Sequence, residues 1–283
     1  GNPGRDRQWQ TEVEQAVAAV EIDADTAQVY AFFAEQILAP LSSELCRFLE
    51  DTSVLEDLSP QRCDALRQRD DSALLLEEVK RHGLFVSSRA GWLAYHSLFR
   101  DFLRLRLARD PQRWRTLMRR AGDLSRSEKQ IEHALDCYLA ADATDEAFAL
   151  LRESIPRLRR LSRQTTLLAC FERLGHERLL PSDLLLAQAR VYSDLALWER
   201  AYLALQLVET IGNEEESWEA HLLHADLLNL QGQTAQAQVV LNEVDSTRLP
   251  PNLQLIYHLT AGRIQIITGA IDDAIVSLEQ ALT

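Results

Sequence analysis

The feature that most constrains the fold of this chain is a repeat of 36 to 37 residues in its C-terminal half. The repeat is marked by three alanines, Ala201, Ala237 and Ala274. Other residue types recur at fixed offsets from these alanines: small residues twelve positions earlier (Ala189, Ala225 and Gly262) and leucine four positions later (Leu205, Leu241 and Leu278). A period of this length is typical of a solenoid of paired antiparallel helices, in which small residues let the two helices approach closely.

Two glycines mark the turn inside each pair. Gly232 and Gly269 each stand five positions before a marker alanine, where a glycine ends the first helix and permits a tight turn. We therefore expect tetratricopeptide-like repeats over 181–283, with the chain stopping inside the second helix of a repeat. A looser unit is marked by Ala147, 54 residues before the next marker alanine. We expect a helical connection and a degenerate first repeat over 111–180, with an insertion of about 18 residues that forms a helix or an irregular connection.

The composition favours a mostly α-helical protein. Only 10 glycines and 8 prolines occur in 283 residues, too few for an all-β protein joined by turns, and good helix formers dominate. The net charge of −13 makes the chain a poor non-specific binder of nucleic acid, because such binding depends on neutralising phosphates. No apolar run is long enough to span a membrane. The four cysteines form no CxxC pair, so we expect free thiols in a reducing cytoplasm.

The N-terminal half has a different pattern, in which helical segments are interrupted by a change to the alternation typical of strands. The expected elements are a helix over 26–52 broken at Pro40, a helix over 60–69 capped by Ser59, a helix over 72–82 ended by Gly83, a β-hairpin of Leu84–Val86 and Trp92–Tyr95 around the turn Ser87–Gly91, and a helix from Ser97. These are the ingredients of a winged-helix domain. We place it at 26–110, after an N-terminal extension or the end of a preceding domain at 1–25.

Three segments resemble the MalT-type regulators, which are signal-transduction ATPases of the large LuxR-type class. The segments are Leu74–Val86, Trp92–Leu103 and Ile131–Leu135, and their most specific parts read HSLFRDFL and IEHAL. The resemblance covers about residues 27 to 283. Members of that family carry a P-loop nucleotide-binding domain, a winged helix, a superhelical sensor and a C-terminal helix-turn-helix that binds DNA. The resemblance implies an all-α fold here, with a winged-helix domain followed by a tetratricopeptide-like α-solenoid that senses a signal.

Two parts of the family plan are absent from this sequence. No GxxxxGK[ST] motif occurs, nor any Gly-Lys pair, so nothing cradles phosphates as a P-loop does. We therefore expect a non-catalytic fragment without a cofactor of its own, from a cytoplasmic regulator that binds ATP or ADP elsewhere. Its winged helix would contact that protein's nucleotide-binding domain, and its repeats an inducer or a protein partner. DNA would be reached only through a missing C-terminal domain, and no membrane is involved. A generic tetratricopeptide scaffold without nucleotide-linked switching is the alternative.

His96 is the candidate for contact with a nucleotide. It stands between the expected hairpin and the helix that starts at Ser97, and the resemblance implies that a histidine at this position contacts the phosphates of bound ADP. An imidazole suits that role, because it can donate a hydrogen bond to a phosphate oxygen and gains charge beside one. The alternative is a histidine that caps the following helix or fills a half-buried gap.

The expected ligand groove follows the first helix of each repeat, since solenoids present an extended concave surface there. The candidate groove residues supply aromatic and hydrogen-bonding groups: Tyr192, Trp218, His221, Tyr257 and His258. Residues 166–283 hold 6 Lys and Arg against 16 Asp and Glu. We therefore expect a neutral or cationic small molecule, or a protein with a basic patch, rather than an anion.

Two further clusters admit two interpretations each. His221 and His224 lie three residues apart on one expected helix, and with a nearby carboxylate they could ligate a metal. Since His258 occupies a repeat position equivalent to His221, the repeat explains these histidines better, and we expect no metal site. The arginine-dense stretch 100–126 either grips phosphates or an acidic partner, or forms a solvated face with weak salt bridges.

We expect the purified chain to show no nucleotide hydrolysis above background and only weak affinity for ATP, because it has no phosphate loop. A phosphate-release assay and calorimetry measure the two quantities. Micromolar ATP binding that a point mutation in this chain abolishes would contradict the expectation.

Overall fold

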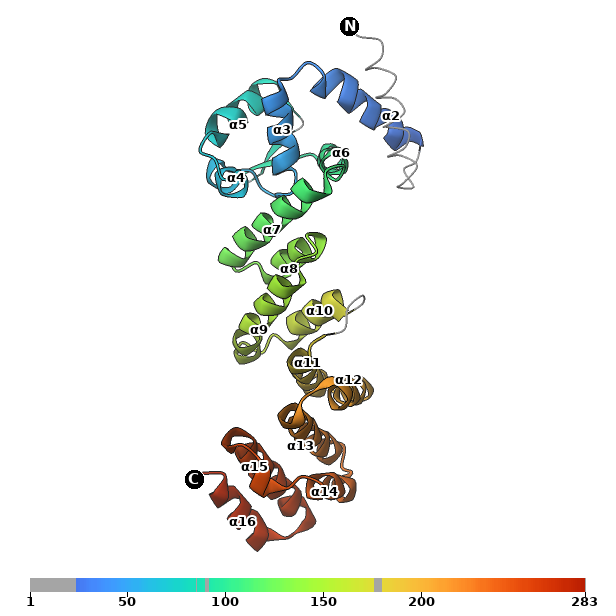
Figure 1. The fold of residues 1–283 in the computed structure, drawn as a ribbon, viewed down its shortest axis with the longest axis vertical. Coiled ribbons are helices and arrows are strands. Elements are labelled where there is room, and N and C mark those ends of the chain that lie inside the picture. The colour runs from blue at the N-terminus through green and yellow to red at the C-terminus, as the bar shows by residue number, and fades with distance from the viewer. Residues whose placement is uncertain (1–23, 85, 90–91, 176–179, 283) are drawn as a thin grey trace. The chain divides into compact units, whose positions relative to one another are not determined.

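The computed structural model describes residues 24–84, 86–89, 92–175 and 180–282. The segment 1–25, expected to be an extension or the end of another domain, lies outside the described residues except for its last two. The described residues are helical almost throughout, with one two-stranded sheet (Figure 1). The chain divides into two compact units, Gly1–Ala147 and Phe148–Thr283. The expected all-α class, with a winged helix followed by a solenoid, is confirmed.

The first unit begins with the winged-helix elements, and local sequence signals set their ends. The hydroxyls of Ser42 and Ser59 each accept a hydrogen bond from the backbone N–H three residues on, which satisfies a donor that the helix itself cannot pair. Pro60 follows in the first turn, where its missing N–H does no harm. The elements are α2 (Ala24–Phe32), the π-helical η1 (Phe33–Leu38), α3 (Ser43–Thr52), α4 (Pro60–Arg67), α5 (Ser72–Arg81), β1 (Val86–Arg89), β2 (Trp92–Tyr95) and α6 (Ser97–Leu107).

The hairpin begins later than the sequence predicted. The first strand was expected at Leu84–Val86 and the turn at Ser87–Gly91, but β1 pairs with β2 from Val86 opposite Tyr95 through to residue 89. Leu84 belongs to the C-terminal end of α5 instead. Its N–H donates to the Val79 carbonyl at 3.2 Å, and Gly83 adopts a φ of 62°. This Schellman-type ending buries the Leu84 side chain and delays the strand.

An aromatic cluster fills the core of the first unit. Phe33 from η1 meets Phe99 of α6 at a centroid distance of 5.2 Å, and Tyr30 from α2 meets Phe102 at 5.4 Å. The buried hydroxyl of Tyr95 lies 2.7 Å from that of Thr52, which satisfies both polar groups inside an apolar core. The hairpin and the helices before it are therefore fixed to α6.

Helix pairs follow the winged helix and continue through the second unit. The insertion expected between Ala147 and Ala201 contains a helix, α10. The elements are α7 (Pro111–Ser127), α8 (Ile131–Ala140), α9 (Thr144–Arg160), α10 (Gln164–Gly175), α11 (Ser182–Asp194), α12 (Trp198–Ile211), α13 (Glu214–Leu230), α14 (Thr234–Asn242), the 3-10 turn η2 (Ser246–Arg248), α15 (Pro251–Thr268) and α16 (Ile271–Gln280). Helix α11 packs on α12, α13 on α14 and α15 on α16, as the period predicted.

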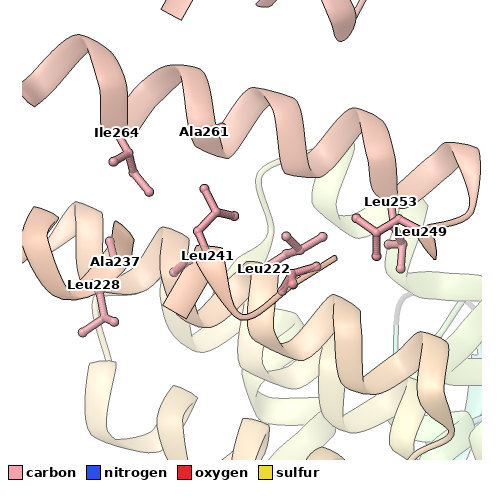
Figure 2. Packing of buried hydrophobic residues seen from close by; sticks show 10 residues of the cluster. Leu222, Leu228, Ala237, Leu241, Leu249, Leu253, Ala261 and Ile264 are labelled. Atoms are coloured by element: carbon pink, nitrogen blue, oxygen red, sulfur yellow. The ribbon is translucent and has the colours of Figure 1, made fainter. Parts of the chain in front are cut away.

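The marker positions of the repeat lie where the helices of each pair touch. Ala189 and Ala201, like Ala225 and Ala237, are fully buried. Around Ala225 and Ala237 the large apolar side chains of α13, α14 and α15 meet in one cluster (Figure 2). Leu241 of α14, one of the repeated leucines, is part of it. The residues that repeat in the sequence are therefore those that make the contacts within and between helix pairs.

The turn of each pair uses one left-handed residue at a fixed position. Gly232 and Gly269 have φ values of 76° and 82°, as the sequence predicted. Five residues before the alanines of the two earlier pairs stand Asp142 and Ala196, with φ values of 58° and 56°. A β-carbon makes this conformation unfavourable, so Ala196 holds a strained backbone that the repeat imposes.

Replacing Ala196 with glycine is expected to stabilise the second unit by about 1 kcal/mol, because glycine adopts the left-handed conformation without the steric cost. The reverse change at the equivalent position, Gly232→Ala, is expected to destabilise it by about the same amount. Urea unfolding followed by circular dichroism measures both. A loss of stability in the Ala196→Gly variant would contradict this account of the turn.

Candidate functional site

The second unit carries a cleft of about 380 Å³ lined by the first helices of its repeats. Helices α11, α13 and α15 contribute most of the lining, with Arg159 of α9 at one end. The apolar lining consists of Leu222, Leu223, Ile256 and Leu259. Ligand sites in proteins are concave and largely apolar, with a few placed polar groups. This cleft is concave and combines these four apolar side chains with charged and hydroxyl groups.

Three ion pairs cross the cleft, and each joins neighbouring helices. Arg159 lies 3.8 Å from Asp194 between Nη2 and Oδ2, and Arg263 Nη2 lies 2.7 Å from Asp226 Oδ1. Between them Arg190 bonds the Glu219 carboxylate. Three arginines thus face three carboxylates, and the charges in the lining balance. Because these side chains are partly exposed, each pair stabilises the fold by little.

Asp226 is the least solvated charge in the cleft. Burial raises the pKa of its carboxyl group, and the nearby guanidinium of Arg263 only partly opposes this rise. Desolvation disfavours the charged form of a carboxyl group. The position is therefore costly for an aspartate when the cleft holds no further hydrogen-bond donor.

The five aromatic and histidine residues expected in a groove do not line this cleft. Tyr192 lies beneath the Arg200 guanidinium of α12 at 5.9 Å, and Trp218 packs beside Arg248 at 5.7 Å. His221 Nδ1 lies 2.8 Å from the Ser217 carbonyl oxygen one turn earlier on its own helix. The last two, Tyr257 and His258, have their rings edge to face at 5.4 Å, and the tyrosine packs against the apolar cluster.

The sequence contains a signal from which the cleft residues could have been identified. Glu219, Leu223 and Asp226 in α13, like Ile256, Leu259 and Arg263 in α15, recur at spacings of three to four residues, which places them on one face of a helix. Each candidate groove residue lies one position away from a residue that lines the cleft. Successive residues of a helix are rotated by about 100°, so these side chains lie outside the lining of the cleft.

The histidine pair does not assemble a metal site. His224 lies against the Tyr202 ring at 5.1 Å, edge to face, and burial lowers its pKa. Within the part of the chain that the structure describes, no group of three or more His, Cys, Asp or Glu is placed to hold a metal ion.

His96 is exposed at the start of α6. It stands at the N-cap position, yet its side chain makes no capping hydrogen bond to the helix. The structure thus shows neither the helix cap nor the half-buried gap filler that formed the alternative.

The arginine-dense stretch 100–126 is largely used inside the first unit. Arg104 donates from Nε to the Ser53 carbonyl at 3.0 Å, and Arg106 donates to Glu50 at 3.0 Å. Arg120 donates to the Leu66 carbonyl at 3.2 Å. These bonds hold α6 and α7 against α3 and α4, so these arginines are structural ties rather than a purely solvated face.

A cysteine and a histidine come together without forming a nucleophile. Cys137 Sγ lies 3.7 Å from His133 Nε2, and His133 Nδ1 lies 3.9 Å from Glu56. Burial raises the pKa of the Cys137 thiol to about 12, so the reactive thiolate is scarce near neutral pH. The arrangement is a packed contact between a buried thiol and a partly exposed histidine.

Among the described helices, none combines the length and the apolar character that crossing a membrane requires.

Comparison with known proteins supports the fold. Residues 34–115 match the model of the MalT winged helix domain, a non-catalytic module. A crystal structure of a Signal Transduction ATPase with Numerous Domains (STAND) protein with a tetratricopeptide repeat sensor, from Pyrococcus horikoshii, shares 16% identity over 89% of this chain and 45% of that chain. Its TM-score of 0.37 is too low to support an argument.

Regulators and a kinase are similar in sequence. The HTH-type transcriptional regulator MalT of Vibrio campbellii is 26% identical over 90% of this chain, which spans 30% of that protein. The serine/threonine-protein kinase PknK of Mycobacterium tuberculosis is 30% identical over 59% of this chain and 15% of its own length. The chain therefore spans under a third of these relatives. With the match of residues 34–115 to the MalT winged helix domain, the resemblance of the chain to MalT-type regulators is confirmed.

Proposed function

We propose that this chain is the sensing region of a MalT-like cytoplasmic regulator, and that its helical repeats bind a small-molecule inducer in the cleft of α11, α13 and α15. The observation that carries the proposal is the cleft itself, which combines an apolar lining with three ion pairs between neighbouring helices. A ligand that exchanges hydrogen bonds with these pairs would hold the first helices in one arrangement. That is how binding at a solenoid can be transmitted along the repeats.

The charge of the cleft indicates a neutral inducer. The three arginines and three carboxylates of the ion pairs cancel, while residues 166–283 as a whole are acidic. An anion would be repelled during approach, and a charged ligand of either sign would have to displace an existing pair. A neutral molecule with several hydroxyl or amide groups can bond both partners of a pair without breaking it.

The remaining parts of the proposal concern the longer protein. The chain itself has no catalytic role, ATP or ADP is bound by a nucleotide-binding domain elsewhere, and DNA is reached through another domain. The winged helix contacts the nucleotide-binding domain, with His96 directed to the phosphates of ADP. The exposed position of His96 at the start of α6 supports this role.

A second candidate function is a scaffold for protein partners. It is favoured by an apolar stripe on α12, where Leu203, Leu207 and Ile211 are 61%, 42% and 43% exposed at four-residue intervals. Such a stripe is typical of a helix face that binds another protein. A partner held there would leave the cleft unoccupied, so variants of the two surfaces distinguish the candidates.

A thermal-shift screen with neutral small molecules tests the sensing role. Compounds that stabilise the chain are expected to lose their effect in the Asp226→Asn variant and to keep it in Asp273→Asn, which changes an exposed carboxylate on α16. Equal shifts in both variants would place binding elsewhere. Mutations in the full-length protein that confer resistance to the inducer, if found only outside the repeats, would contradict the proposal.

The stability of Asp226→Asn gives an independent prediction. A carboxyl whose pKa is raised by folding destabilises the folded state above that pKa, and this cost disappears as the pH falls through it. The variant is therefore expected to unfold about 1 to 4 °C higher than the natural chain at pH 7. The difference should vanish below about pH 3, where the aspartate is protonated in both states. An asparagine that lowers the unfolding temperature at pH 7 would contradict it.

His96→Ala in the full-length protein is expected to speed ADP release and favour the active, oligomerising state, because a donor to the phosphates is lost. In the chain alone the change should alter stability little, since the side chain is exposed. His82→Ala, an exposed histidine of α5's C-terminal end, is the control. Unchanged ADP release in His96→Ala would show that the residue has no role in nucleotide binding.

A further inference from the structure

The first unit contains a second cavity of about 380 Å³, lined by residues of α3, α4 and α7. Five of the lining residues are arginines: Arg47, Arg67, Arg69, Arg113 and Arg120. Only three are carboxylates: Glu44, Asp51 and Asp110. In a chain with a net charge of −13, this is a local excess of positive charge.

Arg67 forms the buried wall of this cavity. Its side chain is 5% exposed, lies over the Phe48 ring at 4.8 Å, and bonds Asp71 and the Ser72 hydroxyl through Nη1. Its Nε is buried and has no hydrogen-bond partner among the described residues. The nearest carboxylate oxygen, of Asp51, lies 4.0 Å away. A buried donor left unpaired is costly, and this one belongs to a side chain fixed in the cavity lining.

Two of the three lining carboxylates, Asp51 and Asp110, are already engaged. Arg113 donates from Nε to Asp51 at 2.8 Å and from Nη1 to Glu50 at 2.9 Å. The Asp110 carboxylate accepts the backbone N–H of Arg113 at 3.0 Å and caps α7. These bonds fix the guanidinium of Arg113 before any ligand arrives, so little side-chain entropy remains to be lost on binding.

Arg47 and Arg69 supply the positive charge that is not used in this way. Both are exposed, and the single carboxylate near Arg69 is that of Asp71 at 3.6 Å, which Arg67 already holds. Glu44, also exposed, is the one lining carboxylate that caps no helix and bonds no arginine in the described residues. Two exposed arginines therefore line a cavity whose wall also contains the buried guanidinium of Arg67.

We propose that this cavity binds a phosphate group. Arginine forks match the oxygen geometry of phosphate and bond it bidentately. A phosphate in the cavity would meet the exposed guanidinium groups of Arg47 and Arg69, in a lining of five arginines and three carboxylates. The cavity lies in a different unit from the repeat cleft, so the two sites are tested independently.

Inorganic pyrophosphate is the probe, titrated into the whole chain at low salt and followed by NMR or calorimetry. The expected dissociation constant is in the millimolar range, because the chain has no phosphate loop. The double variant Arg47→Gln/Arg69→Gln should bind about tenfold more weakly. The control Arg81→Gln/Arg160→Gln removes the same charge from exposed positions outside the cavity and should bind as the natural chain does. Circular dichroism verifies that both remain folded.

A comparison of the affinities for ADP and pyrophosphate identifies the source of the phosphate. ADP that binds more tightly than pyrophosphate assigns the site to a nucleotide, and ADP that binds equally or more weakly assigns it to a simple phosphate. Equal weakening in the two double variants would mean that only net charge matters, and undiminished binding in Arg47→Gln/Arg69→Gln would place the anion elsewhere. Either result overturns the proposal.

Discussion

The helix pairs of both units depend on close contacts at which one of the two helices carries a glycine or an alanine. A β-carbon on Gly122 would lie 2.6 Å from the Tyr138 ring, and one on Gly262 would lie 2.8 Å from Leu278. Both distances are shorter than any packed contact, so a larger residue would push the helices apart. Buried alanines make the corresponding contacts of the pairs α11/α12 and α13/α14. The distance between the two helices of each pair is therefore set by the small residues at these contacts.

This spacing determines where function can reside in the repeats. Because each second helix packs closely on its first helix, the first helices α11, α13 and α15 lie next to one another. Their facing positions form the cleft, and Arg190, Glu219, Asp226 and Arg263 bridge it. Partly buried ion pairs contribute little to stability. The half-buried Asp226, whose pKa burial raises, is therefore held in the cleft at a cost to folding.

The sequence predicted the features that depend on interactions between residues close together in the chain. The period identified the helix pairs, and glycine identified two of the turns, because those signals reside in the residues themselves. The left-handed turns at Asp142 and Ala196 carried no such signal. The roles of Arg104 and Arg120 were equally hidden, since their carbonyl partners lie about fifty residues away in the sequence. The candidate groove residues were selected for their side-chain chemistry. Whether a residue lines the cleft depends instead on its angle around the helix axis, and this angle differs strongly between neighbouring residues.

Hydrogen exchange measured by mass spectrometry, with and without a small molecule that stabilises the chain, tests the central claim most directly. Binding in the cleft predicts slower exchange in α11, α13 and α15, around residues 190–194, 219–226 and 256–263. The second helices α12, α14 and α16 should change less, because they line no part of the cleft. Protection confined to α12 and α14, with the first helices unchanged, would contradict the account.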